Sequence, residues 1–378
     1  MNKKLLAVAL ATAFAAPAMA EGVQIYGAID YGVLVRGGSD GGLPSSSGTK
    51  SQFEDGISGE NFLGFKGSED LGNGMQLGFD AQFRFSADTS TAFYTRTANV
   101  TLSGDFGTLI GGRVGGARYS FTNMYDPFGG YTVGGAAGFI GGQADVADNA
   151  IVYITPELAP GLKILAAYTS SLDQEDMAGI DQNRKGSLLT SSDRPLYAVA
   201  ALYNNGPLSI TLDYENARKY NTSLYQTLNI YVAGASYDFG VAKLSAYYEN
   251  LDFNGGPLKS YNSFLLGALA PVSANTNIRA SFVQTEVGNG LSALLADGEC
   301  RKYSLGLTHA ISKRTTFYTD VAKIDNDTNT ACSITKNGHR DNPATVGTSA
   351  VQVGTLEQDG GVAGRGSWGF DAGIRHTF

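Results

Sequence analysis

The sequence lacks any apolar run long enough to cross a bilayer as a helix. Such a helix needs about 20 consecutive apolar residues, and the longest run, 5–16, is too short. Lys3 and Lys4 precede this run and Ala18-Met19-Ala20 follows it, which is the pattern of a secretory signal peptide. We therefore expect residues 1–20 to be removed, and residues 21–378 to form the mature domain.

Cysteine and histidine are also scarce. There are two cysteines and three histidines, and no histidine lies at ligand spacing from a cysteine, so no metal site is expected. Cys300 and Cys332 both fall in predicted loops at the same end of a strand pair. In an exported protein these two residues can form a disulfide, and two unpaired loop thiols are the alternative.

Basic residues are outnumbered, with 27 Lys and Arg against 35 Asp and Glu and a formal net charge of −8. This balance argues against nucleic-acid binding. No helix is expected after the glycine-rich stretch 111–116, so it does not predict a phosphate site or a nucleotide cofactor. His309, His339 and His376 are isolated from any nucleophile, so no catalytic triad and no enzyme is predicted.

What the sequence does contain is 50 glycines, 20 tyrosines and 19 phenylalanines, with no linker or charge block that divides the chain. This composition is typical of many short strands joined by tight turns. The stretch 75–85 shows the clearest alternation: Met75, Leu77 and Phe79 begin one apolar face, whereas Gln82 and Arg84 lie on the polar face. A strand with lipid on one side and water on the other has this pattern.

Sixteen segments fit such a pattern, and a long loop over residues 37–58 separates the first two. They are 23–36, 61–68, 75–85, 94–103, 108–113, 149–156, 162–171, 196–203, 208–215, 225–237, 241–250, 261–270, 276–285, 301–311, 315–323 and the last stretch to Phe378. The fold class predicted is all-β: a 16-stranded antiparallel transmembrane β-barrel in the bacterial outer membrane, closed so that lipid meets no open sheet edge.

The segment 94–103 is ambiguous. Arg96 shares a face with Ala98, Val100 and Leu102. If Arg96 faces the pore, strict alternation leaves a polar outer face, which is costly in lipid and acceptable against another subunit. The pattern therefore hints at oligomerisation, and the alternative is that Arg96 reaches water from a strand end.

The glycine-rich stretch from Arg113 to Asp148 interrupts the strands. It has a basic start with Arg118, an aromatic and acidic middle around Asp126, and an acidic end with Asp145. Its glycines let it fold tightly, but it cannot build a core of its own. We expect it to fold into the barrel and narrow the lumen.

Several motifs, in this order, resemble those of the Gram-negative trimeric general porins over nearly the whole mature chain. They are Ile25-Tyr26-Gly27, the run 63–72 (LGFKGSEDLG), Asp105-Phe106-Gly107-Thr108, Asp126-Pro127-Phe128-Gly129, the run 311–315 (ISKRT) and the end 373–378 (GIRHTF). The resemblance implies a homotrimer in lipid and lipopolysaccharide, whose terminal Phe378 is read by the barrel assembly machinery.

The resemblance also implies that residues 115–147 are the third extracellular loop, which forms the constriction. The constriction residues it implies are Lys66 and Arg96 on the wall, Arg113 near the loop base, Asp126 on the loop, Gln82 at a position that is often acidic, and Arg84 on the same inward face as Gln82. Phe62 and Ile154 depart from the family, because they stand where a pore-facing arginine and a polar residue are usual.

The function expected is passive diffusion of ions and small hydrophilic solutes. Two unit charges about 10 Å apart in water interact by only about 0.4 kcal/mol, so we expect the pore to prefer one ion sign rather than exclude the other. The alternative is a channel selective for small anions or organic acids. Such channels can use a track of aromatic side chains, and tyrosines expected to face the pore, such as Tyr26 and Tyr247, leave this alternative open. The loops from Asp40 and Asp325 leave open a further role as an adhesin or phage receptor.

Overall fold

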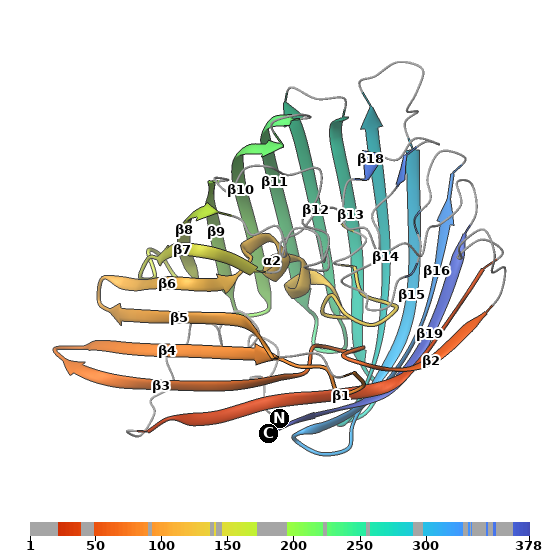
Figure 1. Ribbon diagram of the computed structural model, residues 1–378, viewed down its shortest axis with the longest axis horizontal. Coiled ribbons are helices and arrows are strands. Elements are labelled where there is room, and N and C mark those ends of the chain that lie inside the picture. Colours follow the sequence, from red (N-terminus) through yellow and green to blue (C-terminus); the bar gives the residue numbers. More distant parts are fainter. Residues whose placement is uncertain are drawn as a thin grey trace.

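The computed structural model describes residues 22–38, 49–89, 93–136, 140, 146–171, 195–221, 225–254, 258–289, 298–327, 332, 334, 345–346, 351–352 and 366–378. Most of them form one closed antiparallel sheet (Figure 1). Its strands are β1 (Gln24–Gly37), β2 (Lys50–Asp55), β3 (Phe62–Gly72), β4 (Met75–Arg84), β5 (Tyr94–Gly104), β6 (Gly107–Gly115), β7 (Val146–Ile154), β8 (Leu162–Ser171), β9 (Leu196–Asn205), β10 (Leu208–Asn221), β11 (Tyr225–Asp238), β12 (Lys243–Asn254), β13 (Leu258–Pro271), β14 (Thr276–Asn289), β15 (Gly298–Ala310), β16 (Thr315–Asn326) and β19 (Ser367–Thr377).

The first and last strands close the barrel. β1 pairs with β19 from Ala28 opposite Thr377 to Gly37 opposite Trp368, and Gly27 exchanges two backbone hydrogen bonds of 3.1 Å with Phe378. The short strands β17 (Thr345–Val346) and β18 (Val351–Gln352) pair only with each other.

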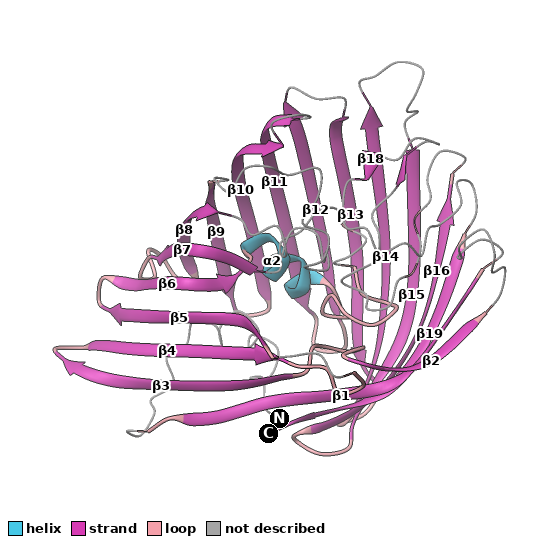
Figure 2. Ribbon diagram, viewed as in Figure 1, coloured by secondary structure: helices cyan, strands magenta, loops and turns pink. Residues whose placement is uncertain are grey.

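A helix, α2 (Ala117–Tyr125), lies within the curve of the sheet (Figure 2). It begins directly after β6, so the expectation that no helix follows residues 111–116 was wrong. No helix in the described ranges is both long and apolar enough to span a membrane.

The 16-stranded barrel is confirmed, with one interruption. β2 pairs with the second half of β1 and β3 with its first half, so β2 and β3 together occupy a single strand position. The predicted loop over 37–58 was therefore wrong for residues 50–55, which continue the wall. Residues 56–61 leave the wall between these two strands, and Asp30 bridges the gap: its amide donates to Asn61 at 2.6 Å and its carboxylate accepts from the Ser58 amide at 3.0 Å.

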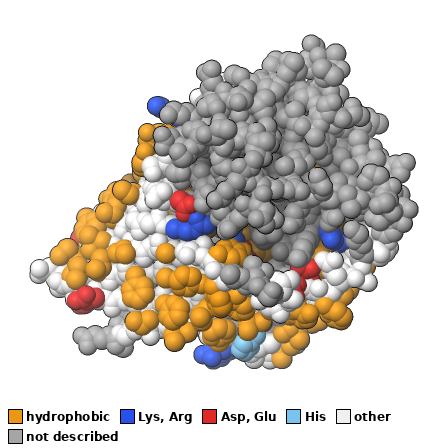
Figure 3. Space-filling view, viewed as in Figure 1, with side chains coloured by type: hydrophobic (Ala, Val, Ile, Leu, Met, Phe, Trp, Pro, Cys, Tyr) orange, Lys and Arg blue, Asp and Glu red, His pale blue; other side chains and the backbone are white. Residues whose placement is uncertain are grey.

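The alternation of the strands separates an apolar outer face from a polar inner face. Leu77, Phe79 and Leu109 are exposed, and Figure 3 shows hydrophobic side chains gathered over this part of the wall. By contrast, Arg84 on β4 and Asp30 on β1 are buried. The outer face needs no covering protein layer if it meets lipid.

A β-bulge decides the orientation of Arg96. In the pairing of β4 with β5, Gln82 lies opposite Thr97 and Phe83 lies opposite Thr95, so Arg96 is an extra residue in the ladder. A bulge of this kind re-aims a side chain. Arg96 therefore reaches Gln82 inside the barrel, while Val100 is exposed on the outside. The polar outer face considered for this strand does not exist, and the hint of oligomerisation drawn from it loses its basis.

The two cysteines form a disulfide, with their Cα atoms 6.3 Å apart. Cys300 lies in β15 rather than in a loop. The side chain of Asn326 donates to the Cys332 carbonyl at 2.9 Å and accepts from its amide at 3.0 Å. Ile334 is buried, and its amide donates to Ser367 at 3.1 Å. The bridge thus ties the connection between β16 and β19 to the wall.

Candidate pore constriction

Residues 117–136, between β6 and β7, lie against the inner face of the barrel at places where the wall has glycines instead of larger side chains. A Cβ atom added at three wall glycines would collide with this segment, and one added at a fourth, Gly306, would lie only 3.0 Å from it. The pairs are Tyr125 with Gly234 of β11, Pro127 with Gly267 of β13, Phe128 with Gly306 of β15, and Val133 with Gly369 of β19. Glycine allows this close approach because it has no Cβ. The segment therefore crosses the inside of the wall from β11 to β19.

Hydrogen bonds hold the helix end of this segment to β10 and β12. The Tyr125 hydroxyl donates to Thr211 Oγ1 at 2.8 Å, and the Ser245 hydroxyl donates to the Tyr125 carbonyl at 2.6 Å. Tyr247 lies beneath, fully buried, with its ring centroid 6.4 Å from that of Tyr125. Tyr247 is therefore not exposed to the lumen, so it gives no support to the selective channel considered above.

Residues 133–135, toward the other end of this stretch, are also hydrogen-bonded to the wall. The Val133 amide donates to Asp371 Oδ2 at 2.6 Å, and Lys302 Nζ donates to the Gly135 carbonyl at 2.7 Å. Lys302 and Asp371 are both buried on the wall strands β15 and β19. Residues 117–136 are thus hydrogen-bonded to the wall near both of their ends.

The start of α2 is capped by side chains of the same two strands, β10 and β12. Gly116 offers no side-chain cap, and the first turn has no acidic residue. Glu215 of β10 accepts the backbone N–H of Arg118, and the Arg118 side chain pairs with Glu249 of β12 at 3.4 Å. A carboxylate at a helix N-terminus offsets its positive partial charge. Arg118, the basic start of the predicted loop, is thus buried in a structural pair.

Asp126 does not present a charge to the lumen. It is 5% exposed, and its carboxylate accepts the amides of Phe128 at 3.0 Å, Gly130 at 3.0 Å and Ala136 at 2.7 Å. Burial raises the pKa of this carboxyl, while the three N–H groups and the charge of Lys302 oppose the rise. The expectation of a pore-facing acid at Asp126 is therefore wrong. The residue holds a reverse turn, a role that its position in the motif did not reveal.

Residues 56–61 form a second inward segment. The Gly56 amide donates to the Asp30 carbonyl at 3.1 Å, and the Thr132 amide donates to the Ile57 carbonyl at 2.7 Å. Ile57 is 1% exposed. Arg375 of β19 donates to the Gly59 carbonyl at 2.5 Å. This segment therefore joins β1, β19 and the tip of the loop that carries Thr132.

The second segment places Glu60 between two wall arginines. Its carboxylate oxygens lie 2.7 Å from Arg84 Nη2 and 2.7 Å from Arg96 Nε. Arg96 Nη1 also donates to Gln82 Oε1 at 2.6 Å. We did not predict Glu60, because it lies between β2 and β3, outside both strands, where alternation does not tell which way a side chain points.

Next to this group, further polar side chains of β1, β3 and β4 contact one another. Gln82 Nε2 donates to the Tyr26 hydroxyl at 2.8 Å, and that hydroxyl donates to Asp80 Oδ1 at 2.5 Å. Lys66 Nζ lies 4.6 Å from the centroid of the Tyr26 ring. The structure thus brings together four of the predicted wall residues, namely Lys66, Gln82, Arg84 and Arg96, on β3, β4 and β5.

Arg113 lies one strand away, on β6. It pairs with Asp148 of β7, and its Nε donates to the Arg96 carbonyl at 2.9 Å. Arg113 lies two residues before the end of β6, and its part in the constriction stays a prediction. Asp145 lies outside the described residues.

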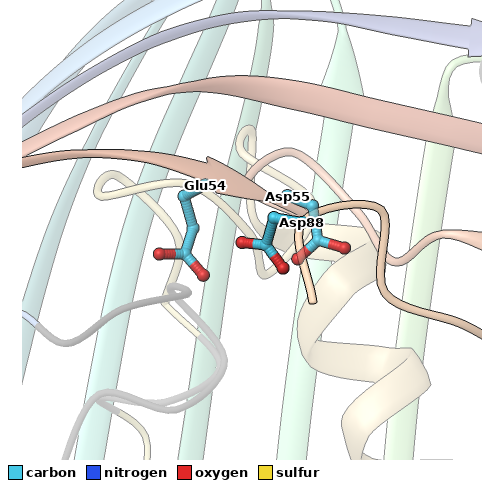
Figure 4. A group of neighbouring side chains, drawn as sticks. All are labelled: Glu54, Asp55 and Asp88. Atoms are coloured by element: carbon cyan, nitrogen blue, oxygen red, sulfur yellow. The ribbon is translucent and has the colours of Figure 1, made fainter. Parts of the chain in front are cut away.

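Glu54, Asp55 and Asp88 have carboxylate oxygens within 4.8 Å of one another (Figure 4). Their neighbours already supply hydrogen bonds. Asn61 donates to Asp55 at 2.8 Å, Gln52 to Glu54 at 2.5 Å, and Ser86 to Asp88 at 2.6 Å. We therefore assign this group to the attachment of residues 54–61 and 86–88.

Comparison with known proteins agrees with this architecture. The family model described as Gram-negative porin matches residues 7–329. The chain belongs to the Gram-negative porins. It is 29% identical to outer membrane porin protein 32 of Delftia acidovorans over 100% of both chains, and 28% identical to an outer membrane porin protein of Bordetella pertussis over 84% of this chain and 93% of that one.

Solved porin structures have the same fold. The anion-selective porin from Comamonas acidovorans matches with a TM-score of 0.75 at 26% identity, over 94% of this chain and 99% of that one. The trimer form of OmpT of Vibrio cholerae matches with a TM-score of 0.61 at 14% identity, over 95% of this chain and 100% of that one, which shows the fold alone. This porin is thus an outer-membrane protein with a barrel that spans the membrane many times.

Proposed function

We propose that this porin is a general diffusion channel whose constriction lies between residues 115–147 and the wall formed by β3, β4 and β5. The observation that carries the proposal is the fixed position of residues 117–136 within that segment, which hydrogen bonds anchor to the wall. Four wall glycines and the anchors at Thr211, Ser245, Lys302 and Asp371 hold it against one side of the barrel. Ions and small hydrophilic solutes would pass beside it, and size would select among them.

The ion preference of this pore is proposed to be weak. Lys66, Arg84, Arg96 and Arg113 supply positive charge, and Glu60, Asp80 and Asp148 supply negative charge close by. Gln82 adds no charge where the family often has an acid. Charges of both signs within one screening length, about 8 Å at physiological salt, largely offset each other for an ion in the lumen.

A channel selective for small anions or organic acids is the second candidate. The solved porin of Comamonas acidovorans is described as anion-selective, and Arg84 with Arg96 is a pair of guanidinium groups suited to a carboxylate. Here Glu60 already occupies the space between them. A solute carboxylate would have to displace it, so we favour the general channel.

Assembly and surroundings follow from the same family membership. We propose a homotrimer in lipid and lipopolysaccharide, inserted by the barrel assembly machinery through the strand that ends at Phe378, with residues 1–20 removed first. We propose no catalytic role: His309 and His376 are exposed and share hydrogen bonds of 2.9 Å with Thr276 and Thr315. Electrophoresis in detergent tests the trimer, which should run as one band of about three times the monomer mass until it is heated.

Reversal potentials of the purified protein in planar bilayers under a salt gradient test the diffusion function. We expect conduction by both ions with a modest preference, unchanged by added sugars or organic acids. Concentration-dependent block by one class of organic acid would favour the selective channel instead.

A further inference from the structure

Glu60 is built into the constriction wall by a break in the barrel sheet. Residues 56–61 leave the wall where β1 passes from pairing with β3 to pairing with β2. The hydrogen bonds from Gly56 to Asp30 and from Arg375 to the Gly59 carbonyl fix this path. Glu60 therefore lies at a defined point inside the barrel and not on a free loop.

Both oxygens of Glu60 face wall arginines at 2.7 Å, and its side chain is 11% exposed. One of these arginines, Arg96, faces inward only because of the bulge opposite Gln82 and Phe83. Two local irregularities, in β2–β3 and in β5, thus bring these charges together.

The other acids of the region are placed differently. Asp126 is buried in its turn, Asp80 accepts the Tyr26 hydroxyl lower on the wall, and Asp148 pairs with Arg113 on the neighbouring strands. Within the described residues, Glu60 is the acid that pairs with both Arg84 and Arg96. Its negative charge acts where their positive charges would otherwise attract anions.

We propose that Glu60 is the acidic residue that sets the ion preference of this porin, by offsetting the positive field of Arg84 and Arg96 in the constriction. This inference rests on the proposed diffusion function. Arg84, Arg96 and Glu60 together carry a net charge of +1. Neutralising Glu60 raises the net charge of this group to +2. The pore then shifts toward anions.

The experiment measures reversal potentials of wild type and Glu60→Gln in planar bilayers under a potassium chloride gradient. We expect the anion-to-cation permeability ratio to rise about threefold at physiological salt, the change for one unit charge about 6 Å from the ion path with screening. Glu60→Asp, which keeps the charge, should stay close to wild type. An unchanged ratio in Glu60→Gln would overturn the proposal.

A charge-balanced variant tests the same point without leaving an arginine unmatched. Arg84→Gln alone should shift the pore toward cations, and Arg84→Gln combined with Glu60→Gln should return it close to wild type. These two variants differ by Glu60 alone, so they decide the question even if Glu60→Gln by itself does not assemble. Equal reversal potentials for the two would overturn the proposal.

A matched control removes one negative charge far from the constriction. Glu157, in the turn between β7 and β8, is exposed and accepts the Gly161 amide at 2.7 Å. Glu157→Gln should leave the permeability ratio unchanged. Wild-type protein that does not conduct would contradict the diffusion function, whereas conduction with no effect of Glu60 contradicts this inference alone.

Discussion

The ring of Tyr125 occupies the space that a side chain at Gly234 would need. Tyr125 is 1% exposed and bound to Thr211 and Ser245, so the ring cannot move aside freely. The contact between the end of α2 and β11 therefore fixes the position of the constriction loop relative to the wall.

Replacing Gly234 with valine should therefore displace the loop. Overpacking a filled site costs about 1 to 3 kcal/mol, and the barrel sheet has enough other contacts to remain closed. We expect altered single-channel conductance with unchanged heat resistance of the barrel. Gly78→Val on β4 is the control, because a Cβ there meets its nearest atom at an ordinary 3.5 Å. Identical conductance for Gly234→Val and wild type would contradict the assigned loop position.

Asp126→Asn should disturb the loop without changing ion preference. The amide that replaces one carboxylate oxygen would face a backbone N–H, because the two oxygens of Asp126 together accept three such groups. Leaving a buried donor unmatched costs about 1 to 3 kcal/mol. We expect noisier single-channel currents and the wild-type reversal potential. A quiet channel with an altered reversal potential would show that Asp126 acts on permeating ions after all.

Lys66→Gln should raise the cation-to-anion permeability ratio about threefold at physiological salt, since it removes one positive charge from the wall. Lys66→Arg keeps the charge and the contact with the Tyr26 ring, so it should behave as wild type. Reversal potentials under a salt gradient provide the measurement. If both variants match wild type, Lys66 lies too far from the ion path to belong to the constriction.

Removing the disulfide should loosen the connection between β16 and β19. A cross-link of this sequence separation, 32 residues, constrains the unfolded chain by about 3 to 4 kcal/mol in the chain-entropy view. The double variant Cys300→Ser and Cys332→Ser should unfold at lower temperature. Protease should also cleave the chain between β16 and β19 faster in this variant than in wild type. Reducing agent should have no further effect on the variant. Equal thermal midpoints for the oxidised wild type and the variant would contradict a stabilising bridge.

Period-two alternation predicted the barrel because lipid and water impose it on each strand separately. Met75, Leu77 and Phe79 are read correctly from their neighbours alone. The alternation failed at Arg96, because a bulge places two residues opposite one and exchanges the faces. It also missed β2 within a stretch rich in glycine and serine, since that strand is recognised only by its pairing with β1.

The constriction was harder to predict, because it depends on contacts between segments that are far apart in the sequence. Lys66, Gln82, Arg84 and Arg96 lie on wall strands, and the structure places them together. Asp126 lies in a loop. An aspartate before Pro-Phe-Gly can bind the backbone two residues on, as it does with Phe128, but its burial and its contact with Ala136 depend on how the loop folds back. Glu60 depends on the break between β2 and β3 and on Arg375 at the other end of the chain.

The central claim, an open aqueous path beside a fixed loop, is tested most directly by single-channel conductance of the purified wild-type porin over a range of potassium chloride concentrations. The account predicts discrete openings whose conductance rises nearly in proportion to salt concentration. Conductance that saturates at low salt, or no conductance at all, would contradict it.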